Sequence, residues 1–162
     1  NLRTLTHIPF SCELYGSPLP NTQGYFKKIK AYIKREKLEK LVVLKGVTNK
    51  LRAQIKKATI VTVPSIAEPF GRVAVEAMTC AKPVVASNCD GLAEIVVNNQ
   101  TGLLVKPGDS LGFARAFQEL LNNPRYTKKL GLAAYKRYKR YFTLRHHVKE
   151  IEKVYRNLLS QR

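Results

Sequence analysis

The sequence has few cysteines and no long apolar run. Cys12, Cys80 and Cys89 form no CxxC or CxH spacing, which argues against both a disulfide framework and a zinc site. A reducing compartment fits this cysteine content best. No apolar stretch approaches the roughly 20 residues that a bilayer-spanning helix needs, and no signal peptide opens the chain. We therefore expect a cytoplasmic protein that crosses no membrane and holds no metal.

Acidic residues are also scarce. Eleven Asp and Glu stand against 29 Lys and Arg, which gives a formal net charge of +18. Such a charge favours anionic partners: nucleic acid, phosphorylated metabolites or an acidic membrane surface. Charge alone does not choose among them. The length of 162 residues and the 44% hydrophobic content fit a single domain with an ordinary core, residues 1–162, and argue against disorder.

Short apolar runs alternate with longer amphipathic segments, and this rhythm predicts an α/β domain with a mostly parallel sheet. Each run is nearly all apolar, as in parallel strands that helices cover on both faces. The predicted strands are residues 10–15, 41–44, 59–63, 83–86 and 102–105.

The predicted helices follow from apolar spacings of three and four and from their end signals. Thr48, Asp109 or Ser110, and Thr143 are candidate helix caps, and Pro124 suits a helix start. The last third, residues 124–160, is helical without strands. The other helices are expected at residues 23–37, after Thr48, at 71–79, after Gly91 and after Asp109.

The stretch EPFGRVAVEAM, residues 68–78, places two glutamates on either side of a helix start. Glu68 follows the predicted strand 59–63, so it lies at the carboxyl edge of the sheet, where open α/β sheets bind ligands. The backbone amides from Gly71 to Val73 begin the helix and favour an anion such as phosphate. Gly71 also lets a ligand approach the backbone.

Two carboxylates aimed at a phosphate would repel it, so hydroxyl groups on either side are their expected partners. A sugar at one end of a diphosphate and a ribose at the other would fit Glu68 and Glu76. The alternative is that Glu68 is a solvated loop residue and that Glu76 pairs with Arg72 as an ordinary surface bridge.

The segment VPSIAEPFGRVAVEAMTCAKPVVASNCDGLAEIVVNNQTGLLV, residues 63–105, resembles retaining glycosyltransferases of the GT-B fold, family 4. The family's two glutamates separated by seven residues match Glu68 and Glu76, and the downstream Pro-Val-Val, Gly-x-x-Glu-Ile-Val and Gly-x-Leu-Val patterns match as well. Weaker similarity covers almost the whole chain, including LYGSPLP, LVVLKGV and the final helix. The resemblance implies the C-terminal, donor-binding half of a GT-B fold, a three-layer Rossmann-like α/β/α domain.

The resemblance also assigns roles to residues. Glu76 would bind the ribose hydroxyls, and Glu68, the candidate catalytic residue, would lie against hydroxyls of the transferred sugar. Lys45 and Val47 would lie beside the base of a UDP-, GDP- or ADP-sugar. A hexosyl unit would be transferred to an acceptor glycan or lipid-linked sugar with retention of its anomeric configuration, without a metal or other cofactor. Backbone contacts to sugar and diphosphate would come from Phe70, Gly71, Arg72 and Val73.

Four departures from the family pattern stand out. The Arg and Lys that normally hold the diphosphate are not found, since Arg3, Lys27 and Lys28 have neither the spacing nor the position. The first strand, which belongs between strands 10–15 and 59–63, and the amino-terminal acceptor domain are also missing. Ala81 replaces a usual Gly. We therefore expect a fragment or a subunit completed by another chain, with weak donor binding and little transfer alone.

Two further alternatives remain open. The stretch YKRYKRYF, residues 135–142, interleaves basic and aromatic residues, but Tyr135, Tyr138 and Phe142 form one helical stripe. This pattern favours core packing with a solvated basic face, with membrane-surface contact as the alternative and no nucleic acid. The chain could also be a non-catalytic subunit or partner-binding module with the same fold. A nucleotide-sugar epimerase fits the long match less well.

Overall fold

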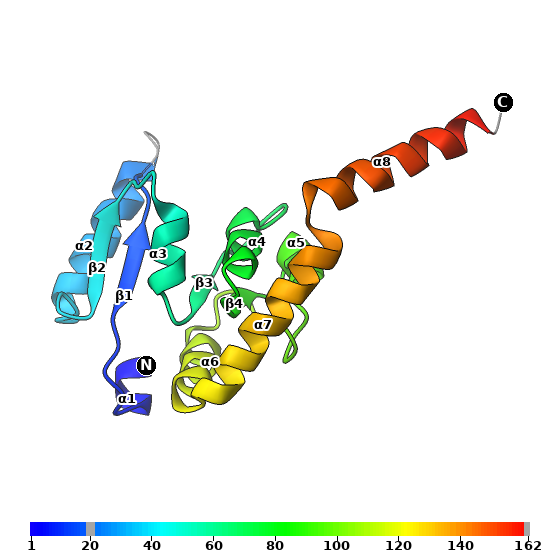
Figure 1. Ribbon diagram of the computed structural model, residues 1–162. Coiled ribbons are helices and arrows are strands. Elements are labelled where there is room, and N and C mark those ends of the chain that lie inside the picture. The colour runs from blue at the N-terminus through cyan, green and yellow to red at the C-terminus, as the bar shows by residue number, and fades with distance from the viewer. Residues whose placement is uncertain (19–21, 161–162) are drawn as a thin grey trace. The chain divides into compact units, whose positions relative to one another are not determined.

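The computed structural model describes residues 1–18 and 22–160 (Figure 1). By their contacts these residues form two compact units, which are described separately below. Unit 1 consists of Asn1–His7 and Arg52–Arg162, and unit 2 of Ile8–Leu51. The end of the LYGSPLP stretch, from Leu19, lies outside the described residues.

Unit 2 is a parallel strand pair with one long helix. Strand β1 (Cys12–Tyr15) pairs with β2 (Val42–Gly46), and helix α2 (Gln23–Arg35) connects them. The predicted strand and helix positions are confirmed, although β2 reaches two residues further than expected and so includes Lys45. Among the described residues of this unit only Ile33, on α2, is buried.

Unit 1 contains a parallel three-stranded sheet with the order β3-β4-β5. The strands of the two units pair as separate sheets, β1-β2 in unit 2 and β3-β4-β5 in unit 1. The strands are β3 (Val61–Val63), β4 (Val84–Ser87) and β5 (Gly102–Val105). The helices are α1 (Leu2–Leu5), α3 (Leu51–Lys57, which starts at the unit boundary), α4 (Arg72–Thr79), α5 (Asp90–Ile95), α6 (Ser110–Asn122), α7 (Pro124–Tyr141) and α8 (Leu144–Leu159).

Helices cover both faces of this sheet. All four residues of β4 are buried, although its side chains alternate between the faces. Val85 packs on one face with Leu120 of α6 and Leu130 of α7, while α4 and α5 also contact the strands and bury Met78 and Leu92. The predicted α/β architecture with parallel strands, layered between helices, is therefore confirmed.

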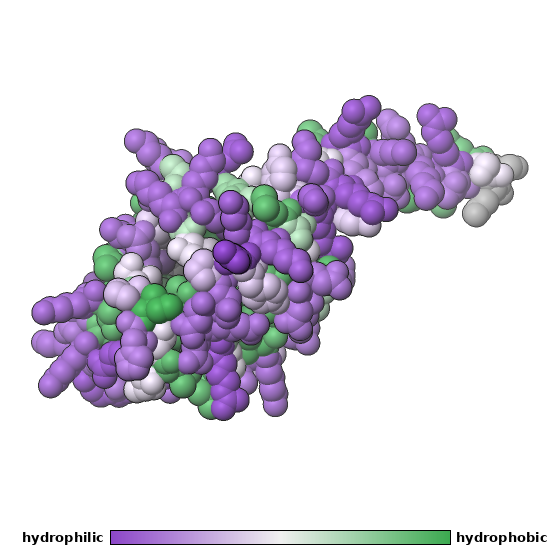
Figure 2. Space-filling model, turned by 60° about the horizontal axis from the view of Figure 1, so that its bottom comes forward, coloured by the Kyte–Doolittle hydropathy of each residue, from purple (hydrophilic) through white to green (hydrophobic). Residues whose placement is uncertain are grey.

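Several predicted helix ends are also present. The Asp109 carboxylate accepts a hydrogen bond from the Gly112 amide at 2.8 Å, and the Thr143 hydroxyl accepts one from the His146 amide at 3.2 Å. Pro124 occupies the first turn of α7. None of the helices within the described ranges is long and apolar enough to cross a bilayer. The face drawn in Figure 2 is dominated by hydrophilic side chains, as the net charge leads one to expect.

Candidate functional site

The two motif glutamates flank the junction between β3 and α4, at the carboxyl edge of the unit 1 sheet. The chain leaves β3 at Val63 and enters α4 through Gly71, which has a left-handed backbone with φ 95°. A Cβ at this position would lie 2.6 Å from Cδ2 of Leu92, which belongs to the first turn of α5. Gly71 is thus required by its own backbone and by close packing inside the protein, whereas the sequence suggested ligand approach as its reason.

The Glu68 side chain turns back onto the start of α4. Its Oε1 accepts a hydrogen bond from the Gly71 amide at 3.1 Å, and its Oε2 accepts one from the Ser65 hydroxyl at 3.4 Å. The expectation that the Gly71 amide is free for a phosphate is therefore wrong, because the Glu68 carboxylate occupies it. Each carboxylate oxygen keeps a second lone pair, so the half-buried Glu68 can still accept a hydroxyl from a ligand.

Two amides of the helix start remain without a partner. In the part of the chain that the structure describes, the N–H groups of Arg72 and Val73 meet no hydrogen-bond acceptor. They point out of the positive end of α4, whose macrodipole favours an anion. Phe70 and Val73 expose 53% and 40% of their surface beside these groups. The start of α4 therefore has two unpartnered amides, bordered by two exposed apolar side chains.

The backbone of Glu68 is held by α5, an arrangement that no local spacing in the sequence revealed. The Glu68 amide donates to the Asp90 carboxylate at 3.1 Å, and the Gly91 amide donates to the Glu68 carbonyl at 3.2 Å. A Cβ on Gly91 would lie 2.5 Å from the Phe70 carbonyl oxygen. The only sequence signal for this contact is that both segments follow neighbouring parallel strands at the same sheet edge.

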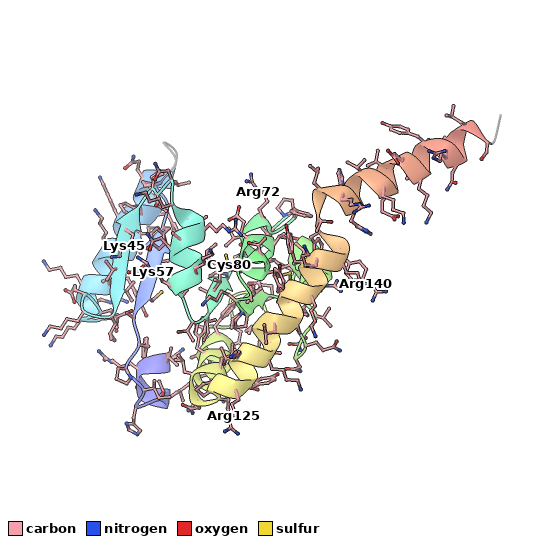
Figure 3. The ribbon with its side chains drawn as sticks, viewed as in Figure 1. Lys45, Lys57, Arg72, Cys80, Arg125 and Arg140 are labelled. Carbon is pink, nitrogen blue, oxygen red and sulfur yellow. The ribbon has the colours of Figure 1, made fainter. Side chains whose placement is uncertain are left out.

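Glu76 lies on the second turn of α4, one turn beyond Arg72. Arg72 projects from the start of the helix (Figure 3), and its Nη2 lies 3.8 Å from Oε1 of Glu76. The side chains are 84% and 39% exposed, so this surface pair contributes less than about 1 kcal/mol to stability. The pair anticipated as the alternative exists, but it is too weak to hold Glu76 away from a ligand.

Lys45 and Val47 belong to unit 2. Lys45 ends up within β2, where its Nζ lies 3.1 Å from a carboxylate oxygen of Glu13. The Tyr15 hydroxyl donates to the other oxygen of Glu13 at 2.6 Å, and this bond, then burial and the Glu13 charge, raise the pKa of Tyr15. Val47 follows the strand and is 75% exposed. The proposed contacts of Lys45 and Val47 with a base stay predictions.

The local electrostatics of the loop are acidic. Burial, and then the negative charges of Asp90 and Glu68, raise the pKa of the Cys89 thiol. Its Sγ lies 3.8 Å from the Ser65 carbonyl oxygen. The thiol is therefore protonated at neutral pH, so it is a poor candidate for a nucleophile. Two carboxylates face the same loop, in line with recognition of hydroxyls there.

Two open concavities lie away from this loop. One, of about 300 Å³, is lined by residues of α2 and β2, and the other, of about 350 Å³, by residues around β5 and α6. Both are open, and neither includes Glu68, Gly71 or Glu76. The polar groups that converge on one helix end belong to the β3–α4 loop, which is therefore the candidate site. No group of three or more metal-ligating side chains occurs within the described residues.

The sequence matches the family described as glycosyl transferases group 1 over residues 1–137. The chain belongs to this family. An uncharacterised glycosyltransferase of Methanocaldococcus jannaschii is 33% identical over 134 residues, which is 82% of this chain and 38% of the relative. A glycogen synthase of Mycobacterium tuberculosis is 40% identical over 87 residues, which is 54% of this chain and 21% of that enzyme. The chain thus spans well under half the length of these curated relatives.

Solved structures of this family's fold superpose closely. The Anabaena protein HepE, in complex with UDP, matches with a TM-score of 0.85 and 29% identity over 98% of this chain and 44% of HepE. Sucrose-phosphate synthase of Thermosynechococcus elongatus matches with a TM-score of 0.83 and 31% identity, over 93% of this chain and 39% of the enzyme. These neighbours confirm the predicted half of a GT-B fold.

Proposed function

We propose that this chain is the donor-binding, C-terminal half of a retaining family 4 glycosyltransferase, which transfers a hexosyl unit from a nucleotide-diphospho-sugar. The observation that carries this proposal is the loop between β3 and α4. It places the Glu68 carboxylate and the unpartnered amides of Arg72 and Val73 at one helix end, with Glu76 one turn further along. The binding of UDP by the similar protein HepE supports the choice of ligand.

In this proposal each group has a separate task. The Arg72 and Val73 amides and the positive helix end bind the diphosphate and stabilise the charge that develops as it leaves. Glu68 accepts hydroxyls of the transferred sugar, and Glu76 those of the ribose. Phe70 supplies a further backbone contact to the sugar and diphosphate. Neither a metal nor another cofactor takes part.

The acceptor, a glycan or a lipid-linked sugar, is proposed to bind elsewhere. The chain covers 38% to 44% of the first matched relatives, so the residues that bind the acceptor and the basic pair for the diphosphate would belong to further sequence or to a partner chain. The open setting of the loop supports this view, because a site made of one sheet edge is poorly enclosed. We expect weak donor binding and little transfer by these 162 residues alone.

Calorimetric titration with UDP-, GDP- and ADP-glucose tests donor binding. Glu76→Ala should weaken the affinity for the preferred donor about tenfold or more, because a carboxylate that accepts ribose hydroxyls is lost. Glu152→Ala is the matched control: it removes one exposed carboxylate from α8, outside the motif, and should leave the affinity unchanged. Equal affinity of Glu76→Ala and the unchanged protein would contradict the proposal.

A non-catalytic module that binds a membrane surface or partner is the second candidate, favoured by the outer face of α7. This helix carries no acidic residue, and its exposed basic side chains include Arg125 and Arg140 near its two ends (Figure 3). Leu132 and Tyr135 are exposed on the same helix. Co-sedimentation with phosphatidylserine vesicles, combined with no binding of any of the three donors, would favour this candidate over the first.

A further inference from the structure

Asp90 adopts a backbone conformation that its residue type disfavours. It is the first residue of α5 and has φ 37°, in the left-handed region. This conformation costs an L-residue about 1–2 kcal/mol, although Asp tolerates it better than most. Strain of this kind persists only where surrounding contacts hold it, and it gathers at functional sites. The contacts that Asp90 makes therefore indicate which role the strained backbone serves.

The Asp90 side chain does not serve its own helix. The cap position of α5 is Cys89, and no side chain caps this helix end. The Asp90 carboxylate instead reaches 22 positions back along the chain and accepts a hydrogen bond from the Glu68 amide at 3.1 Å. An aspartate at the cap position would bond to amides of the first turn, but Asp90 lies one residue beyond that position. The bond to Glu68 points to a task in the β3–α4 loop.

The bond clamps one residue of that loop from two sides. Asp90 binds the Glu68 amide, and the neighbouring Gly91 amide binds the Glu68 carbonyl at 3.2 Å. Pro69, which follows, has no N–H to donate, so it adds no backbone anchor of its own. The Glu68 carboxylate then reaches the Gly71 amide from a backbone whose place is already fixed.

We propose that Asp90 is a positioning residue, which holds the Glu68 carboxylate where it meets the donor sugar without touching the donor itself. This inference rests on the proposed function. The hydrogen bond that the Asp90 carboxylate accepts from the Glu68 amide fixes the position of the Glu68 backbone, and this in turn fixes where the Glu68 side chain begins. A substitution that removes the accepting carboxylate oxygen of Asp90 should therefore weaken donor binding, even if the same substitution makes the fold more stable.

Two substitutions separate positioning from stability. Asp90→Gly removes the carboxylate and also relieves the backbone strain, since glycine adopts positive φ without cost. Asp90→Asn keeps an acceptor oxygen and tolerates positive φ, but removes the charge. Glu152→Gln is the matched control for loss of one negative charge, because it lies on α8 away from the loop.

The measurements are calorimetric affinity for UDP-glucose and the thermal midpoint of unfolding. Asp90→Gly should bind UDP-glucose about fivefold more weakly, the loss expected for one hydrogen bond, with an unchanged or higher midpoint. Asp90→Asn should bind UDP-glucose at least as tightly as the unchanged protein does. It keeps an acceptor oxygen for the Glu68 amide and removes a negative charge near the anionic donor. A purely structural residue would move affinity and midpoint together.

The outcomes distinguish the two proposals. If the unchanged protein binds UDP-glucose and Asp90→Gly binds it equally well, the positioning role is overturned and the proposed function stands. The role is also overturned if Asp90→Asn fails to restore what Asp90→Gly loses. If the unchanged protein binds none of UDP-, GDP- and ADP-glucose, the proposed function fails, and the positioning role fails with it.

Discussion

At the scale of single residues, the backbone turn after α4 explains one departure from the family pattern. Ala81 has φ 54° and follows the cap residue Cys80, and the amide of Lys82 bonds back to the Ala77 carbonyl at 3.1 Å. A left-handed residue just past a helix end is a position that glycine normally fills. The family's usual glycine is therefore a backbone requirement, and alanine meets it under strain.

Ala81→Gly should stabilise the protein. The left-handed penalty of about 1–2 kcal/mol disappears, while the added freedom of the unfolded chain costs about 0.4–1 kcal/mol. We expect the free energy of unfolding to rise by up to about 1.6 kcal/mol, measured from the urea midpoint at unchanged slope.

The matched control is Ala133→Gly, an Ala-to-Gly change inside α7. It should lower the free energy of unfolding by about 1 kcal/mol, the usual cost of glycine within a helix. The two substitutions should thus have opposite signs. If both destabilise the protein equally, Ala81 is not strained.

At the scale of elements, Arg137 joins α7 to the last turn of α5. Its Nε and one terminal nitrogen donate to the carbonyls of Ile95 and Glu94, at 2.9 and 2.7 Å. These carbonyls lie at the negative end of a helix of only six residues, where a cation is favourable. The guanidinium also lies 5.2 Å from the Tyr141 ring. Helix α5, whose first residues bind the Glu68 backbone, is thus also bound by α7 at its last turn.

Arg137→Ala should lower the free energy of unfolding by about 2 kcal/mol, because two charge-assisted hydrogen bonds are lost at a partly exposed site. Arg137→Lys should lose less, since lysine keeps the charge but lacks the planar fork that binds both carbonyls. Lys136→Ala, an exposed neighbour, is the control and should change stability by less than about 0.5 kcal/mol. Equal losses for Arg137→Ala and Lys136→Ala would show that the clamp is not stabilising.

The elements themselves were largely predictable from the sequence, and the contacts between them were not. Apolar runs located β4 and β5, and the caps at Asp109 and Thr143 follow from rules that act within a few residues. The Asp90 bond to Glu68 and the Arg137 bonds to α5 span 22 and at least 42 positions. No local spacing encodes such pairs, because they depend on which elements pack together. For the same reason the sequence missed that Glu68 occupies the Gly71 amide.

At the scale of the whole molecule, burial is unevenly shared between the two units. Met78, Val84, Val85 and Leu92 of unit 1 are fully buried, whereas the described residues of unit 2 bury only Ile33. Burial of apolar surface is the main favourable term in folding, at about 25 cal/mol per Å². The free energy that resists local opening must therefore be concentrated in unit 1.

Hydrogen exchange followed by mass spectrometry tests this difference. After correction for intrinsic rates, amides of β1 and β2 should exchange at least about tenfold faster than those of β4, because fewer buried contacts oppose their opening. Both are parallel strands with backbone hydrogen bonds, so β4 is the matched internal reference. Ile33→Ala should widen the difference by speeding exchange in unit 2 alone. Equal protection of β2 and β4 would mean that the two units open as one cooperative body, stabilised by something other than the burial within each of them.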